Sequence, residues 1–251
     1  MSHMPNIVVL VKRVPDTNAK ITVSGGSLDL AAVKFVTSPF DEYAIETALR
    51  HKEANGGTVT ALTLGNDACD KVLKDAKALG VDNLVRLWSE GWENLDSNGV
   101  QSALASAISD LGSEVVYCGK AAADSNAGST GPGVAERLGW ASVSNASTVS
   151  FEEAGVEAMI PSSSGQARVG LNFPCVVSLD KGEMEPRRPN VRGIMMAKRA
   201  VVEVISADAP TPTVNVIRYS PPAEKPPGKT YEGAGNVSSV VQALRNEAGV
   251  I

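Results

Sequence analysis

Histidine and cysteine are scarce in this chain of 251 residues, which contains 2 and 3 of them. Ser2-His3-Met4 has the form of a cloning remnant, so we expect the natural chain to begin at Met4 and to contain only His51. A histidine-based metal site or a Ser-His triad is therefore not expected, and we expect no metal and no catalytic residue. The cysteines are odd in number and lie far apart: Cys69, Cys118 and Cys175. This pattern predicts reduced thiols and no disulfide framework.

Long apolar runs and clustered positive charge are also lacking. No run approaches the ~20 residues of a membrane-spanning helix, and no charged leader precedes an apolar segment. We therefore expect no membrane span and no export, and hence a cytoplasmic location or the mitochondrial matrix in a eukaryote. The formal net charge is −5, with positive charge gathered only around residues 187–199. Nucleic-acid binding needs more positive charge than this, so no nucleic-acid partner is expected.

Strand and helix patterns alternate along the first half of the chain. Asn6–Val14 is a run rich in β-branched residues, typical of a strand buried on both faces of a parallel sheet. The patterns that follow predict a helix from Pro39 that stops at Gly56, a strand at Val59–Leu64, a helix at Asp67–Leu79, a strand at Leu84–Trp88, a helix at Ser97–Leu111, a strand at Val115–Cys118 and a helix at Gly133–Leu138. This order predicts an α/β fold with a doubly wound, mostly parallel sheet, whose ligands bind beyond the carboxyl ends of the strands.

The alternation of strand and helix patterns ends in the second half of the chain. Short alternating runs from Ser147 to Asn172 predict a β-meander attached to the sheet, and Pro174–Asp180 predicts another buried strand. Beyond Ser206 the chain is rich in proline until the helix-like Val237–Ala248. Such a tail is either disordered or an arm on another subunit, and the amphipathic final segment favours the arm. We expect an α/β domain over 4–205 and a C-terminal arm over 206–251.

The stretch "GKAAADSNAGSTGPGVAERLG" at 119–139 contains small and polar residues but no histidine, cysteine or aromatic residue. Small residues let a ligand approach the backbone, and successive amide groups before a helix suit phosphate oxygens. Asp124 could accept from a ribose hydroxyl or hold the loop closed. The loop therefore predicts a nucleotide phosphate site, with a polar surface connection as the alternative. Neither the Walker spacing nor the dinucleotide glycine fingerprint is present.

The segment "SGGSLD" at Ser24–Asp29 is similar to the phosphate loop of enzymes that adenylate their substrates. It lies within a polar hairpin pattern instead of between a buried strand and a helix, so we predict a hairpin turn.

The segment Glu185–Ala200, "EPRRPNVRGIMMAKRA", alternates basic residues with flexible apolar ones. This composition suits an adaptable protein-docking surface, but it equally suits a surface helix whose Ile-Met face belongs to the core.

Four segments together resemble, in order and spacing, the β subunit of electron-transfer flavoproteins. They are "VKRVPD" at 11–16, "SPFDEYAIETALRHKE" at 38–53, "GKAAADSNAGSTG" at 119–131 and "EPRRPNVRGIMMAKRA" at 185–200. The resemblance covers nearly the whole chain. It implies a heterodimer with an α subunit, an FAD held largely by α and approached by β, and a second nucleotide in β. That nucleotide is AMP in the ordinary carriers and a second FAD in the electron-bifurcating members, which also use NADH.

The resemblance also implies two sets of site residues by position in the motifs. The cofactor-binding set is Leu10, Ser38, Pro39, Phe40, Asp41, Leu64, Gly119, Lys120, Ala123, Asp124, Ser125, Asn126, Gly128, Ser129 and Thr130. Phe40 would lie near the α-bound flavin. The partner-docking set is Glu185, Pro186, Arg187, Arg188, Val191, Arg192, Ile194 and Met195. Val191 would be the apolar anchor on acyl-CoA dehydrogenases.

The function implied is electron transfer from flavin dehydrogenases, such as acyl-CoA dehydrogenases, to a respiratory or quinone acceptor, including a membrane quinone oxidoreductase. We expect AMP in this subunit in preference to a second FAD. One alternative is an electron-bifurcating flavoprotein that oxidises NADH. The other is a stand-alone sensor of adenine nucleotides.

Overall fold

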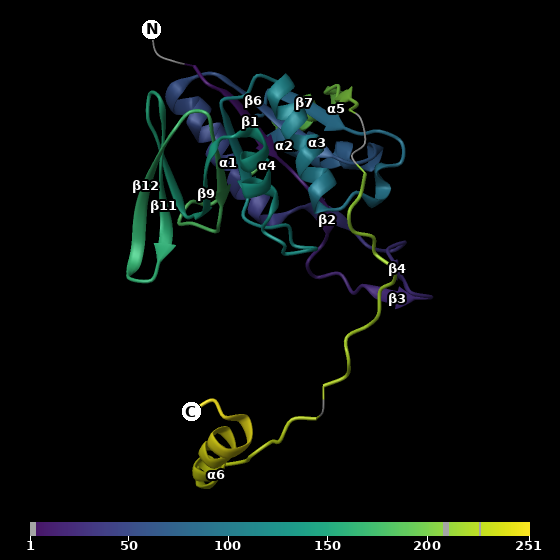
Figure 1. Cartoon of the computed structure of the whole chain (residues 1–251), viewed down its shortest axis with the longest axis vertical. Coiled ribbons are helices and arrows are strands. Elements are labelled where there is room, and N and C mark those ends of the chain that lie inside the picture. Colours follow the sequence, from purple (N-terminus) through teal and green to yellow (C-terminus); the bar gives the residue numbers. More distant parts are fainter. Residues whose placement is uncertain (1–3, 208–210, 226) are drawn as a thin grey trace. The chain divides into compact units, whose positions relative to one another are not determined.

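The computed structural model describes residues 4–207, 211–225 and 227–251, which form two compact units. The larger unit reaches Ile217 and omits residues 22–28. Its centre is a seven-stranded sheet in which each strand runs parallel to its neighbours (Figure 1). The strands are, in spatial order, β14 (Glu203–Ile205), β7 (Asn83–Leu87), β6 (Thr58–Leu64), β1 (Asn6–Leu10), β8 (Val115–Gly119), β13 (Cys175–Leu179) and β9 (Ala141–Ala146). The predicted α/β class and parallel sheet are confirmed.

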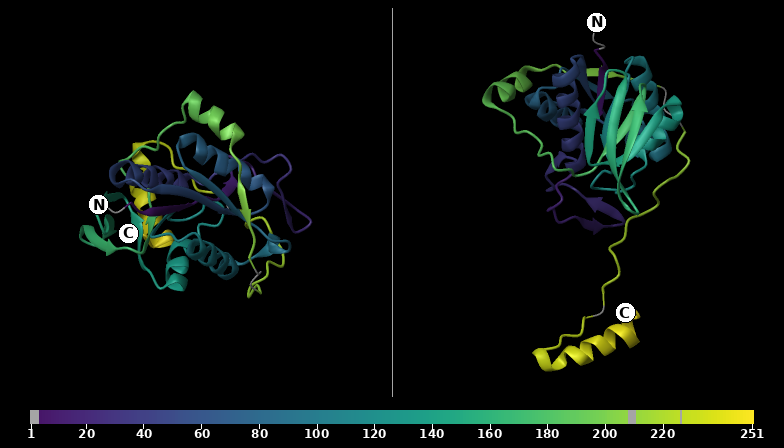
Figure 2. Two further views of the ribbon diagram at one scale, coloured as in Figure 1. Left: turned by 90° about the horizontal axis from the view of Figure 1, so that it is seen from above. Right: turned by 90° about the vertical axis from the view of Figure 1, so that its left-hand side faces the viewer.

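Helices cover both faces of this sheet (Figure 2). One face packs against α1 (Pro39–Asn55) and α2 (Asp70–Leu79), and the other against α3 (Ser97–Asp110) and α4 (Thr130–Leu138). Alternate residues of β1 enter the two cores, because successive strand side chains point to opposite faces. The chain first moves from β1 to β6 and β7, then returns through α3 to β8 on the other side of β1. The switch point of the sheet therefore lies between β1 and β8.

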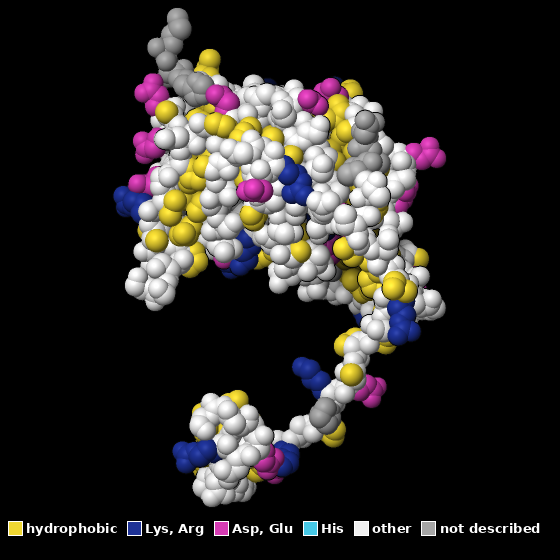
Figure 3. Space-filling model, in the orientation of Figure 1, with side chains coloured by type: hydrophobic (Ala, Val, Ile, Leu, Met, Phe, Trp, Pro, Cys, Tyr) yellow, Lys and Arg dark blue, Asp and Glu magenta, His cyan; other side chains and the backbone are white. Residues whose placement is uncertain are grey.

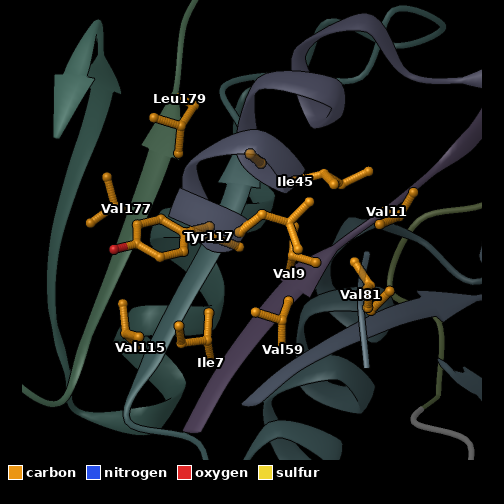
Figure 4. Packing of buried hydrophobic residues seen from close by; sticks show 14 of the residues in the cluster. Ile7, Val9, Val11, Ile45, Val59, Val81, Val115, Tyr117, Val177 and Leu179 are labelled. Carbon is orange, nitrogen blue, oxygen red and sulfur yellow. The ribbon is translucent and has the colours of Figure 1, made fainter. Parts of the chain in front are cut away.

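The core on the α1 face consists mainly of branched aliphatic side chains. Ile7 and Val9 of β1 pack with Val59, Tyr117 and Val177 from neighbouring strands, and all five are fully buried (Figure 4). These strands are buried on both faces, which explains why their sequences are continuous apolar runs instead of alternating ones.

A separate antiparallel sheet follows α4 and β9. It consists of β10 (Thr148–Phe151), β11 (Gly155–Ser162) and β12 (Gly165–Asn172) in sequential order, so the predicted meander is confirmed. His51 of α1 joins this sheet to the main one. Its ring stacks on Phe151 with centroids 4.6 Å apart, and its Nδ1 shares a hydrogen bond of 2.9 Å with the Tyr117 hydroxyl.

The ends of several elements differ from the sequence prediction. The predicted strand 6–14 divides: β1 ends at Leu10, and β2 (Arg13–Pro15) pairs with β5 (Phe35–Thr37) in a small sheet of its own. Helix α4 begins at Thr130, three residues earlier than predicted. The edge strands β9 and β14 were not predicted. Short 3-10 turns precede α2 and α3, at Asp67–Cys69 and Trp92–Asn94.

Asp96 caps α3 and also holds the chain that leaves the larger unit. One carboxylate oxygen accepts from the Gly99 N–H (2.8 Å). The other accepts from the Thr213 N–H and hydroxyl (both 2.7 Å) and from the Val214 N–H (2.9 Å). The hydrogen bonds from Thr213 and Gly99 keep the pKa of Asp96 well below its usual value.

The smaller unit comprises residues 22–28 and 218–251. The hairpin β3 (Thr22–Ser24) and β4 (Ser27–Asp29) turns at two glycines with φ of 58° and 81°, which confirms the predicted hairpin turn. Helix α6 (Val237–Ala243) follows the 3-10 turn Ala234–Asn236 and continues as a π-turn to Ala248. Apolar side chains remain exposed along this unit (Figure 3). Among the described residues, no helix is both long and apolar enough to cross a membrane.

Candidate functional site

β1 and β8, which flank the switch point, and the neighbouring β6 end at one edge of the sheet. Leu10, Leu64 and Gly119 are the last residues of β1, β6 and β8, and the parallel ladders place them at the same edge. Asp41, in the first turn of α1, ties this edge together. Its carboxylate accepts from the Lys12 N–H (2.8 Å) and the Gly119 N–H (3.0 Å).

Asp41 is buried, with 6% of its surface exposed. Burial raises its pKa to about 7, although the Lys12 and Gly119 N–H groups oppose this rise. Gly119 is necessary here, because a Cβ would lie 2.5 Å from Asp41 Oδ1 and 2.8 Å from Phe40 Cβ. The structure thus brings Asp41 and Gly119 together as predicted, but both Asp41 oxygens bind the chain's own backbone.

Ser38 and Phe40 flank this junction. The Ser38 side chain is fully buried at the start of α1, and its hydroxyl has no hydrogen-bond partner among the described residues. The Phe40 ring lies 4.8 Å from Lys120 Nζ, which forms an ion pair of 2.8 Å with Asp180. Asp180 was not identified from the sequence. It is the last residue of the predicted strand 174–180 and directly follows β13 at the same edge of the sheet, and this position was the available signal.

The loop between β8 and α4 is held at two points. Lys12 Nζ forms an ion pair of 2.7 Å with Asp124, and the Asn126 N–H donates to the Ala122 carbonyl (2.8 Å). Asn126 and Gly128 adopt positive φ angles of 50° and 64°. Ala123, Ser125, Asn126 and Gly128 are exposed to solvent, and the side chain of Asp124 is 30% exposed.

The last residues of this loop present unused hydrogen-bond donors. Within the described chain, the amide groups of 127–131 donate no hydrogen bond. Gln101 of α3 supports the loop, because its amide donates to the Ser129 carbonyl (3.0 Å) and hydroxyl (3.3 Å). Sequence analysis missed Gln101, since a polar residue within a helix pattern carries no signal of this contact. Free amides before the positive end of a nine-residue helix can receive an anion.

The basic segment forms helix α5 (Val191–Arg199) on α2, capped by Asn190. Gly193 lets it approach closely, since a Cβ there would lie 2.2 Å from the Ala78 carbonyl oxygen. The Ile-Met face does not belong to the core, because Val191, Ile194, Met195 and Met196 are 42–76% exposed. The alternative of a protein-docking surface stays a prediction.

Arg187 anchors the chain that leads to α5. Its guanidinium contacts Glu46 Oε2 (2.7 Å) and Glu53 Oε1 (2.6 Å) of α1, so this member of the predicted docking set is used within the chain. These hydrogen bonds raise the pKa of Arg187. A groove of about 1080 Å³ lies beside it, lined in part by Glu185, Pro186 and Arg188, and it includes no residue of the 119–131 loop.

Residues 27–210 match the model of the electron transfer flavoprotein domain. The electron transfer flavoprotein subunit beta of Bacillus subtilis is 30% identical over 98% of this chain and its own full length. That of Mycobacterium bovis is 34% identical over 81% of this chain and 79% of its own. The probable subunit beta of Saccharomyces cerevisiae is 29% identical over 88% and 90% of the two chains.

The chain belongs to the electron-transfer flavoprotein β subunit family. This finding confirms the resemblance drawn from the four motifs. Within the described chain, the five amide groups of 127–131 and the buried Ser38 hydroxyl thus have no hydrogen-bond partner. Among the described residues, no cluster of three or more metal-ligating side chains occurs, and the three cysteines are buried and unpaired.

Proposed function

We propose that this chain transfers electrons as the β subunit of a heterodimer with an α subunit, accepting them from flavin dehydrogenases and passing them to a respiratory or quinone acceptor. Family membership is the observation that carries this proposal. The smaller unit supports it, because residues such as Tyr219, Val237 and Ile251 remain exposed without a partner. We propose residues 206–251 as an arm that packs on the α subunit, and a cytoplasmic or mitochondrial-matrix location.

We further propose that this subunit holds a nucleotide at the switch-point edge, with AMP as the preferred ligand. The phosphate would bind the free amides of 127–131 and the hydroxyls of Ser129 and Thr130. Asp41 would position the loop by fixing Lys12 and Gly119, while the small side chains of the loop admit the ligand. An FAD shared with the α subunit supplies the redox chemistry when bound. Phe40, whose ring lies 4.8 Å from Lys120 Nζ, is the residue proposed to lie near this flavin.

The exposed face of α5 is the proposed docking element for dehydrogenases. Val191 is 76% exposed and adjoins Arg192, so an apolar anchor stands beside a charge that can steer association. Arg187 and Gly193 fix this helix on α1 and α2, which leaves the anchor as the part free to contact a partner.

Co-purification with the α subunit tests these proposals. Acid denaturation of the complex should release one FAD and one AMP for each heterodimer. Two FAD, with bleaching of the flavin by NADH, would support the electron-bifurcating alternative instead. A stable, colourless chain without any partner would support the nucleotide sensor, and one FAD without another nucleotide would refute the β-subunit nucleotide site.

A further inference from the structure

Lys12 connects the two parts of the proposed nucleotide site. Its main-chain N–H donates to Asp41 Oδ2 (2.8 Å), which fixes the backbone just beyond β1. Its side chain crosses to the loop after β8, where Nζ lies 2.7 Å from Asp124 Oδ2 and 2.8 Å from Asp124 Oδ1. The motifs assign Asp124 to the site but give Lys12 no role.

The charges at this edge disfavour an anion while the Lys12–Asp124 pair is intact. The lysines that the site residues bring here, Lys12 and Lys120, are each paired with a carboxylate, and the Asp41 carboxyl lies close behind. A phosphate bound to the amides of 127–131 would therefore find both lysines of these pairs already neutralised by carboxylates. Release of one lysine from its carboxylate would provide the phosphate with a positive charge.

Lys12 is the lysine that can be released more easily. Its side chain is 50% exposed and that of Asp124 is 30% exposed, and ion pairs at such accessible positions contribute little to stability. Lys120 is 30% exposed, and its ammonium also lies over the Phe40 ring at 4.8 Å. Its release would therefore cost a second interaction.

We propose that Lys12 is a phosphate-binding residue of the nucleotide site and that Asp124 is its resting partner, from which a bound nucleotide displaces it. This inference rests on the proposed nucleotide function. The chemistry recognised is a nucleotide phosphate group, whether AMP or FAD carries it. A nucleoside without phosphate would leave the Lys12–Asp124 pair in place.

The test uses the complex with the α subunit, stripped of nucleotide and titrated with AMP, FAD and adenosine. Lys12→Gln should weaken the binding of the phosphate-bearing ligand about tenfold or more and leave adenosine binding unchanged. The substitution keeps the main-chain N–H that Asp41 requires. Lys12→Arg should restore most of the affinity, because it keeps a cation of similar reach. If the affinity for AMP falls in Lys12→Gln, Lys12 binds the phosphate of AMP. If the affinity for FAD falls instead, Lys12 binds a phosphate of FAD.

Lys52→Gln provides the matched control. It also removes a lysine from an ion pair, with Asp82 at 2.5 Å, but Lys52 lies at the other end of α1 from Asp41. It should leave the binding of AMP, FAD and adenosine unchanged. The proposal is wrong if Lys12→Gln weakens adenosine and AMP equally, or if Lys52→Gln weakens AMP as much as Lys12→Gln does. If the wild-type complex binds AMP and Lys12→Gln binds it with the same affinity, the role of Lys12 is refuted and the nucleotide site stands. A wild-type complex that binds none of the three ligands refutes the nucleotide site and this inference together.

Discussion

Acid should destabilise the contact between the two sheets through His51. This side chain is fully buried against Phe151, Phe173 and Tyr117, and its Nε2 has no partner within the described chain. Burial lowers its pKa from 6.5 to about 4. The neutral ring therefore contributes stability that is fully present above pH 6.5 and is lost as the pH falls toward 4. Proton linkage converts this pKa difference into a loss of about 2 kcal/mol between pH 7 and pH 5.

Urea unfolding at pH 7 and pH 5 measures this loss, with His51→Gln as the comparison. Glutamine keeps an amide near the Tyr117 hydroxyl but does not titrate in this range. The wild type should lose about 2 kcal/mol more than the variant between the two pH values. The raised pKa of Asp41 acts in the opposite direction, and it cancels in the difference because both proteins contain this residue. Equal losses in the two proteins would show that His51 does not titrate on unfolding as its burial requires.

Three further substitutions and one truncation test the site and the surfaces. Asp41→Ala leaves the Lys12 and Gly119 N–H groups unpaired and should lower the free energy of unfolding at pH 7 by about 2 kcal/mol in urea titrations. Gly119→Ala should destabilise the protein by about 1–3 kcal/mol, because its Cβ displaces the same carboxylate, and an unchanged urea midpoint would contradict this contact. Val191→Glu should slow flavin reduction by a dehydrogenase without loss of FAD, and unchanged coupling would place docking elsewhere. Deletion of 218–251 should weaken association with the α subunit in size-exclusion chromatography while the far-ultraviolet circular dichroism of the sheet persists.

The regular part of the fold was predictable because its signals are local. Continuous β-branched runs identified β1, β6, β8 and β13, and a proline start with a glycine stop identified α1. β9 and β14 were missed, since short edge strands such as "EVI" at 203–205 are paired on one side only and need no apolar run. The strand predicted over 6–14 divides because the Lys12 N–H turns to a carboxylate 29 residues away, a contact that no local pattern reports.

The candidate site was predictable in position but not in its internal bonds. The glycine-rich loop after a buried strand and the rule for parallel sheets together located the edge where Asp41, Gly119 and the loop meet. The Lys12–Asp124 ion pair joins residues 112 positions apart, so only the folded chain reveals it. Arg187 likewise pairs with Glu46 at a separation of 141 residues, so only the folded chain reveals that this expected docking residue is also an internal anchor.

Asp96 makes the start of α3 and the course of residues 213–214 depend on one carboxylate. One oxygen accepts from the Gly99 N–H of α3, and the other accepts from the N–H groups of Thr213 and Val214. A side chain without an acceptor at this position would deprive three backbone N–H groups of their carboxylate partner at once. Fraying of the α3 N-terminus and release of residues 213–214 should therefore occur together, although Asp96 and Thr213 lie 117 positions apart in the sequence.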